Sequence, residues 1–245
     1  DIDRTARALV WGGFANQGQV CVSVERVYAH AAVHDELVEK IVSLTQALRP
    51  GSPSVEGGVD FGSMTWDRQV EIVEERVKTA VAQGATVRTG GKRSGQGLQF
   101  LPTVLTGCKH EMDVMRKEIF GPVLPIAKIN DEEEGVRLAN DSLLGLMAYV
   151  FTRDTARGRR VAERIESGTV MVNDCLLTFG APETPWGGVK QSGIGRTHSD
   201  DGLRELCQLR HVNYDRIALG KELWWYPYSE DVYRQTLKLL KWVFR

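Results

Sequence analysis

One cysteine near the start of the chain has the surroundings of a reactive thiol. Cys21 follows a stretch with helical apolar spacing that ends near Phe14, and it precedes a β-branched and aromatic stretch that begins near Val24. Gly18 lies between them and permits a sharp turn. A thiol at such a junction can face a cleft, where unpaired main-chain N–H groups stabilise both a thiolate and an oxyanion. The alternative is a small buried hydrophobic side chain, the usual state of a free cysteine.

Composition and charge are those of an ordinary globular chain. Of 245 residues, 42% are hydrophobic and 26% are charged, and the net charge is −1. The main body has no basic patch interleaved with aromatic residues, so we expect no nucleic-acid partner. The four cysteines and five histidines show no zinc-like spacing. We therefore expect no metal site, structural or exposed histidines, and free thiols in a reducing cytoplasm.

Apolar spacing predicts helices that alternate with strands after the first helix. Such alternation predicts an α/β fold in which a mostly parallel sheet is covered by helices. No apolar run is long enough to span a membrane. A Pro/Gly/Ser-rich stretch at 50–58, which includes the run V-E-G-G, is read as a turn. The predicted helices are at 37–48, 70–81, 132–139 and 155–166, and the predicted strands are at 24–29, 86–88, 123–129, 147–152 and 169–173.

A series of motifs along the chain resembles the catalytic-domain portion of the aldehyde dehydrogenase superfamily. The resemblance begins with F-x-N-x-G-Q-x-C ending at Cys21 and extends to residue 196. It corresponds to only about the C-terminal half of a complete family enzyme. The further motifs are G-A-T-V with G-G at 84–91, P-T-V-L at 102–105, E-I-F-G-P-V at 118–123, G-L-x-A-x-V-F-T at 145–152, G-T-V-M-V-N at 168–173 and G-G-V-K-Q-S-G-I-G-R at 187–196.

The resemblance implies an NAD(P)-dependent oxidation of an aldehyde to a carboxylic acid. Cys21 would be the nucleophile that forms a thiohemiacetal and then a thioester, with its own N–H as an oxyanion donor. Asn16 would hold the loop by hydrogen bonding. Glu118 would bind the ribose hydroxyls of NAD or NADP, and Phe120 would touch the nicotinamide ring. The local sequence alone, without the resemblance, predicts that Glu118 is an ordinary solvated or ion-paired carboxylate.

The resemblance also places essential parts outside this chain. Family members have a dinucleotide-binding domain and the glutamate of an E-L-G-G motif before the position of Asp1. We therefore expect the chain alone to lack the main cofactor site, the deacylation base and part of the oxyanion hole. One alternative is a non-enzymatic or partner-binding relic of the fold. Another is a cofactor-independent thiol esterase that uses Cys21.

The substrate is expected to be an apolar aldehyde. The residues that the resemblance places along the aldehyde tunnel are apolar or aromatic and include no arginine that would bind a carboxylate. They are Val20, Val22, Leu176, Leu177, Phe179 and Trp186.

The end of the chain departs from the family pattern. We expect a catalytic domain at 1–205, a strand at 206–217 that pairs with a partner subunit in a homo-oligomer, and an aromatic-rich basic amphipathic tail at 218–245. Ser229 can cap a helix whose basic stripe lies opposite an apolar side. Residues 221–245 therefore suit either a membrane surface, which would supply a long-chain aldehyde, or packing on protein. Trp224 and the aromatic residues that follow it precede this helix.

Overall fold

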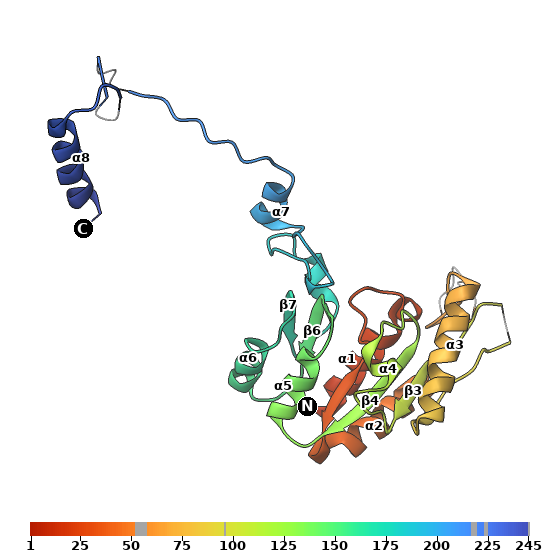
Figure 1. Ribbon diagram of the computed structural model, residues 1–245. Coiled ribbons are helices and arrows are strands. Elements are labelled where there is room, and N and C mark those ends of the chain that lie inside the picture. Colours follow the sequence, from red (N-terminus) through yellow and green to blue (C-terminus); the bar gives the residue numbers. More distant parts are fainter. Residues whose placement is uncertain (52–57, 96, 217–219, 223–224, 245) are drawn as a thin grey trace. The chain divides into compact units, whose positions relative to one another are not determined.

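The computed structural model describes residues 1–51, 58–95, 97–216, 220–222 and 225–244 (Figure 1). The chain divides into two compact units, Asp1–Cys207 and Gln208–Arg245. Most of the predicted V-E-G-G turn, and Trp224 of the tail, lie outside the described residues. Among the described residues, no helix combines the length and the apolar character needed to cross a membrane.

The first unit alternates helices and strands. Its elements are α1 (Ile2–Phe14), η1 (Ala15–Gly18), β1 (Val27–His30), α2 (Ala31–Gln46), α3 (Asp67–Ala82), β2 (Thr86–Thr89), β3 (Thr103–Thr106), α4 (Asp113–Arg116), β4 (Val123–Ile129), α5 (Glu132–Asn140), β5 (Leu144–Gly145), β6 (Met147–Val150), α6 (Thr155–Ala162), β7 (Thr169–Val172), η2 (Leu177–Gly180), β8 (Val189–Lys190) and α7 (Ser199–Glu205).

The largest sheet has four strands in the order β1-β4-β3-β2. β1 and β3 both run parallel to β4, with Val27 opposite Ile126 and Thr103 opposite Val123. β2 is antiparallel to β3 at the edge. Together with the parallel pair β6 and β7, this confirms the predicted α/β fold with mostly parallel pairing.

Side chains of this sheet alternate between two buried layers, because successive residues of a strand point to opposite faces. Val104 and Leu124 pack with α1 and α2 on one face. Leu105 and Val123 pack with α3 and α4 on the other. A parallel sheet covered on both faces accounts for the nearly continuous apolar run of β4, in which every residue except Lys128 is buried.

The strands predicted at 147–152 and 169–173 form β6 and β7, a parallel pair with Met147 opposite Thr169. They are paired with each other and not with the four-stranded sheet. The helix predicted at 155–166 ends earlier, at Ala162, because the N–H groups of Arg164 and Ile165 bond to carbonyls only three residues back. The chain then turns into Gly168 and β7.

Polar side chains begin the helices where the sequence suggests. The carboxylate of Asp1 accepts the N–H of Arg4 at 3.1 Å and caps α1. In the second unit, Ser229 accepts the N–H of Val232 at 3.3 Å and caps α8 (Glu230–Val243). No residue of α8 is buried. Residues 208–215 form neither helix nor strand in the single chain, so the partner-pairing strand at 206–217 stays a prediction.

Candidate active site

The segment before Cys21 has an unusual backbone. Asn16, Gln17 and Gly18 follow one another with φ values of 50°, 57° and 70°, in the left-handed region that non-glycine residues rarely adopt. This turn carries the chain out of α1 and leaves Cys21 exposed at the next turn. The thiol is therefore not a buried hydrophobic side chain. The main-chain N–H of Cys21 donates to no residue in the described part of the chain.

Side-chain amides hold this turn. Asn16 Nδ2 donates to the carbonyl of Gln19 at 3.0 Å, and Gln19 Nε2 donates to the carbonyl of Asn16 at 3.2 Å. Gln19 Oε1 also accepts the N–H of Thr65 at 3.0 Å. The amide of Asn16 thus binds within the loop, the geometry that its predicted loop-holding role requires.

Gly18 brings this turn against a second segment. A Cβ atom on Gly18 would lie 2.2 Å from the carbonyl oxygen of Gly121, closer than atoms can approach. Gly121 cannot readily recede, because its own Cβ position lies 2.3 Å from Val73 Cγ2, and Val73 is fully buried. Two glycines therefore allow the backbones of the segment 15–21, called the nucleophile segment for its predicted role, and the segment 118–121 to touch.

The segment 118–121 presents the two predicted cofactor residues. Glu118 is exposed and makes no hydrogen bond or ion pair with another described residue. Phe120 is half-buried with a φ of 49°. The loop is held by Glu25, whose Oε2 accepts the N–H of Ile119 at 2.9 Å and whose Oε1 accepts the N–H of Phe120 at 3.1 Å. Burial raises the pKa of Glu25 to about 7, against the opposing effect of these two hydrogen bonds.

A tyrosine joins the nucleophile segment to the predicted substrate loop. Tyr149 Oη donates to the carbonyl of Val22 at 2.6 Å and accepts the N–H of Leu176 at 3.3 Å. Burial raises the pKa of this phenol, so it stays protonated and can donate. The tyrosine occupies a variable position of the motif at 145–152, where sequence reasoning assigned it no role.

Of the predicted substrate residues, Leu177 and Phe179 lie on an exposed loop, whereas Val22 is buried beside Cys21. Leu177 and Phe179 are 60% and 56% exposed. Phe179 packs edge-on against Trp186, with ring centroids 5.0 Å apart, and beside His198 at 5.2 Å. Two of the predicted residues are thus brought together, with a histidine that the sequence did not place there.

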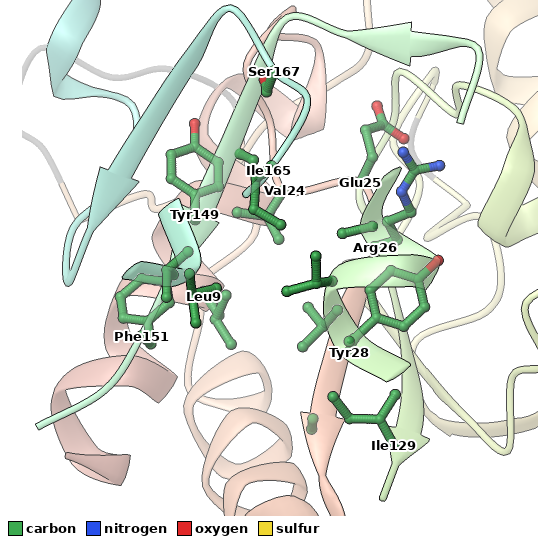
Figure 2. A pocket seen from close by; sticks show the side chains of 18 of the residues that line it. Leu9, Val24, Glu25, Arg26, Tyr28, Ile129, Tyr149, Phe151, Ile165 and Ser167 are labelled. Carbon is green, nitrogen blue, oxygen red and sulfur yellow. The ribbon is translucent and has the colours of Figure 1, made fainter. Parts of the chain in front are cut away.

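A cavity of about 940 Å³ lies beside Cys21, between β1 and β6 (Figure 2). Glu25, Arg26 and Tyr28 line one side, and Tyr149 and Phe151 line the other. Of the predicted site residues, the cavity lining includes only Cys21, Val22 and Glu118. The remainder lie elsewhere on the surface or in the loops, namely Asn16, Val20, Phe120, Leu176, Leu177, Phe179 and Trp186.

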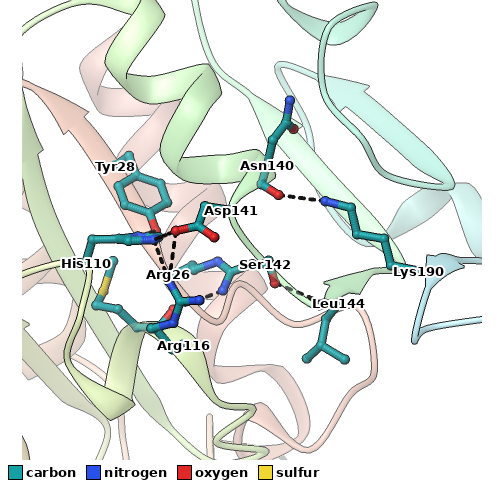
Figure 3. A network of polar contacts seen from close by, with 10 residues as sticks. Arg26, Tyr28, His110, Arg116, Asn140, Asp141, Ser142, Leu144 and Lys190 are labelled. Atoms are coloured by element: carbon teal, nitrogen blue, oxygen red, sulfur yellow. Dashed lines mark hydrogen bonds and ion pairs between the residues drawn. The ribbon is translucent and has the colours of Figure 1, made fainter.

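A polar network fixes the chain just before Glu118 (Figure 3). Tyr28 Oη lies 2.7 Å from His110 Nδ1, and His110 Nε2 lies 2.9 Å from the carboxylate of Asp141. Arg116 donates to the same carboxylate at 3.0 Å. Hydrogen bonds from Arg116 and His110 lower the pKa of Asp141 to about 2. The network ties β1 to α4 and to the end of α5.

Sequence reasoning missed two residues that connect these parts, Glu25 and Tyr149. Glu25 offered one local signal, a charged residue four positions after Cys21 at the entrance to a buried strand. In the described residues, no group of three or more His, Cys, Asp and Glu side chains is arranged to hold a metal ion.

Comparison with known proteins matches residues 1–212 to the Aldehyde dehydrogenase family. A 4,4'-diapolycopene aldehyde oxidase from Methylomonas is 38% identical over 244 residues, which is 100% of this chain and 45% of that protein. The mitochondrial succinate-semialdehyde dehydrogenase of Rattus norvegicus is 39% identical over 216 residues, 87% of this chain and 41% of that protein.

Solved structures show the same relationship. Betaine aldehyde dehydrogenase from Staphylococcus aureus in complex with NAD+ superposes with a TM-score of 0.79 and 33% identity, over 84% of this chain and 41% of that one. Succinate-semialdehyde dehydrogenase from Burkholderia pseudomallei superposes with a TM-score of 0.79 and 40% identity, over 84% of this chain and 42% of that one. The chain spans less than half the length of each of these relatives. It belongs to the aldehyde dehydrogenase family.

Proposed function

We propose that this chain carries the nucleophile and the nicotinamide-side contacts of an NAD(P)-dependent aldehyde dehydrogenase. One observation carries the proposal: the exposed thiol of Cys21 lies on a turn whose backbone touches the segment that bears the unpaired carboxylate of Glu118. A nucleophile and a cofactor contact that are fixed to each other are what a reaction between a bound aldehyde and a bound cofactor requires.

Cys21 acts as the nucleophile. Its thiolate attacks the aldehyde carbon, and the carbonyl oxygen becomes the oxyanion of a thiohemiacetal. The N–H of Cys21 has no partner among the described residues and donates to that oxyanion. Loss of hydride from the thiohemiacetal carbon leaves a thioester on Cys21, and water converts the thioester into the carboxylic acid and the free thiol.

A nicotinamide cofactor, when bound, would supply the acceptor for this hydride. The residues present suit its ribose and ring. The two oxygens of Glu118 have no partner among the described residues and can accept hydrogen bonds from two hydroxyl groups, and the half-buried ring of Phe120, two residues further on, suits contact with a planar ring. The resemblance assigns activation of the water to the glutamate of E-L-G-G, a motif that these 245 residues do not contain.

The substrate that we propose is an apolar aldehyde. Leu176, Leu177, Phe179 and Trp186 offer apolar surface near the nucleophile segment, to which Tyr149 connects their loop. The Methylomonas relative, whose name gives 4,4'-diapolycopene aldehyde as its substrate, matches 100% of this chain, whereas the Rattus norvegicus protein matches 87% of it. We expect decanal to be oxidised in preference to succinate semialdehyde, and the reverse preference contradicts this assignment.

The tail gives a second, separable part of the proposal, namely contact with a lipid surface. Tyr233, Leu237, Leu240 and Phe244 of the tail are exposed, and Trp242 is 77% exposed. Arg234, Lys238 and Lys241 follow the acidic first turn of α8. An exposed amphipathic helix with aromatic and basic residues suits an anionic membrane interface.

Co-sedimentation with vesicles tests the tail. The chain and a version that ends at residue 220 are mixed with phosphatidylcholine vesicles, with and without phosphatidylglycerol. We expect the full chain to bind the anionic vesicles and the shortened chain to stay in solution. Equal binding by both forms excludes the tail as an anchor and leaves packing on protein.

Self-association is a further part of the proposal. Leu209, Val212 and Tyr214 are 95%, 63% and 68% exposed in a stretch that forms neither helix nor strand. Such a stretch can pair with a strand of a second copy. Analytical ultracentrifugation of the chain and of Leu209→Glu tests this, and a monomeric wild-type chain contradicts it. The cytoplasmic location stays a prediction.

Matched cysteine variants test the reaction itself. Cys21 and Cys207 are the two exposed cysteines, so Cys207→Ser controls for loss of an accessible thiol. Wild type, Cys21→Ser and Cys207→Ser are assayed for NAD(P)H formation from decanal, for calorimetric binding of NAD+ and NADP+, and for hydrolysis of p-nitrophenyl octanoate. Oxidation that is lost only in Cys21→Ser supports the proposal.

Two other outcomes of this experiment select the alternatives. Ester hydrolysis that needs Cys21, without binding of either cofactor, identifies a thiol esterase. Absence of both ester hydrolysis and cofactor binding identifies a relic of the fold, whereas absence of oxidation alone agrees with the expectation that the chain lacks the deacylation base.

A further inference from the structure

The carboxylate of Glu25 joins the two segments that the proposed reaction needs. We propose that Glu25 is a positioning residue, which fixes the cofactor-facing segment 118–121 relative to the nucleophile segment 15–21. Its importance for the cofactor rests on the function proposed above. Its role in holding the segment can be tested separately.

The main-chain polar groups of Ile119 and Phe120 are bound by side chains. Their N–H groups donate to the two oxygens of Glu25, at 2.9 and 3.1 Å. Gln69 Nε2 donates to the carbonyl of Ile119 at 2.7 Å and to that of Phe120 at 3.4 Å. Neither residue belongs to a helix or strand. The shape of this segment therefore depends on Glu25 and Gln69 and not on a regular hydrogen-bond ladder.

The backbone of Phe120 needs such support. Its φ of 49° lies in a region that is sparsely populated by non-glycine residues, and conformations of this kind persist where the surroundings hold them. The carboxylate of Glu25 holds the residue through its N–H, and the adjacent Ile119 side chain is fully buried. The ring of Phe120 and the carboxylate of Glu118 are consequently presented in one arrangement.

The nucleophile segment has its own supports, independent of Glu25. Gln19 accepts the N–H of Thr65 at 3.0 Å, and Ser23 Oγ donates to the carbonyl of Gly12 at 3.0 Å. Loss of the Glu25 carboxylate should therefore release residues 118–120 while leaving the thiol of Cys21 in place. A general loss of packing would disturb both.

Glu25→Gln is the substitution that removes one of the two hydrogen bonds that Glu25 accepts with the least change in side-chain size. The glutamine side chain has the size of glutamate but offers one acceptor oxygen, and its NH2 group would face a main-chain N–H, so one of the two hydrogen bonds is lost. Glu134 provides a matched control, because its Oε2 also accepts a main-chain N–H, that of Asn130 at 2.8 Å. Glu134 lies on α5 and is not part of the site described above.

Amide hydrogen exchange in the full chain tests whether Glu25 holds the segment. We expect protection of the Ile119 and Phe120 amides to fall about tenfold in Glu25→Gln, the effect of losing one buried charge-assisted hydrogen bond. Glu134→Gln should leave their protection unchanged. If Glu25→Gln does not fold, Glu25→Asp replaces it, with partial protection expected because a shorter carboxylate can reach only one N–H. Unchanged protection in a folded Glu25 variant overturns the proposal.

Cofactor affinity and thiol reactivity distinguish positioning from a purely structural role. We expect Glu25→Gln to raise the dissociation constant for NAD+ or NADP+ about tenfold, with the rate of Cys21 alkylation by iodoacetamide unchanged in a Cys207→Ser background. Lower protection with unchanged cofactor affinity overturns the positioning role. If the wild-type chain binds neither cofactor, the proposed function fails, and the exchange result alone decides whether Glu25 holds the segment.

Discussion

Replacement of Gly18 by alanine should separate the effect of backbone conformation from the effect of close packing at the nucleophile. Gly18 has a φ of 70°, and an added Cβ in the left-handed region costs about 1–2 kcal/mol. The same Cβ would lie 2.2 Å from the carbonyl oxygen of Gly121, and Gly121 is itself packed against the buried Val73. Forcing an extra group into a packed site costs a further 1–3 kcal/mol, roughly. We expect Gly18→Ala to lower the free energy of unfolding by about 2–5 kcal/mol.

Gly84 provides the control for this prediction. Its φ is 103°, so alanine is strained there as well, but apart from its chain neighbours no described residue has an atom within 4 Å of the added Cβ. Urea denaturation should give a loss of about 1–2 kcal/mol for Gly84→Ala. The alkylation rate of Cys21, measured in a Cys207→Ser background, should change only in Gly18→Ala. Equal destabilisation by both substitutions, with equal thiol rates, would refute the claim that the two segments are packed backbone to backbone.

Three further predictions concern stability. Tyr149→Phe removes the donor to Val22 and should lower the free energy of unfolding by about 1–3 kcal/mol in urea denaturation. Burial raises the pKa of Glu25 from 4.5 to about 7, so the folded chain holds the Glu25 proton more tightly than the unfolded chain does. The stabilisation from this proton is complete below pH 4.5 and is lost as the pH rises through 7. The free energy of unfolding of wild type minus that of Glu25→Gln should therefore fall by up to about 3 kcal/mol between pH 4.5 and 7. A difference that does not change with pH contradicts the raised pKa of Glu25. Phe100→Ala, at a fully buried site, should lower the free energy of unfolding by about 3–5 kcal/mol. Phe179→Ala, at a site that is 56% exposed, should change it by less than about 0.5 kcal/mol, as measured by thermal or urea unfolding.

Much of the fold could be predicted because its signals are local. The predicted strand at 123–129 coincides with β4, and the helix predicted at 132–139 is within one residue of α5 at its end. Ser229 caps a helix as predicted. Apolar spacing and capping residues act within a few positions of the chain, so they can be read without knowledge of the partner elements.

The candidate site was predictable only in part. The motif around Cys21 identified an accessible thiol, and the structure exposes it. The cavity lining, however, includes only Cys21, Val22 and Glu118 of the predicted residues, while Leu177 and Phe179 lie on an exposed loop. A motif identifies residue types and their order, but the direction in which each side chain points depends on the elements packed around it.

The sequence by itself determined the family and most of the alternating helices and strands, and it singled out Cys21 as the candidate nucleophile, since each of these inferences rests on residues that are neighbours along the chain. Only the tertiary structure decided which side chains hold the site together. Glu25 binds the N–H of Ile119, 94 positions away, and Tyr149 binds the carbonyl of Val22, 127 positions away. The type of residue, glutamate or tyrosine, does not predict which distant group its side chain will bind. The partner becomes defined when packing of the sheet and helices removes both groups from water and leaves each as the hydrogen-bond partner within reach of the other.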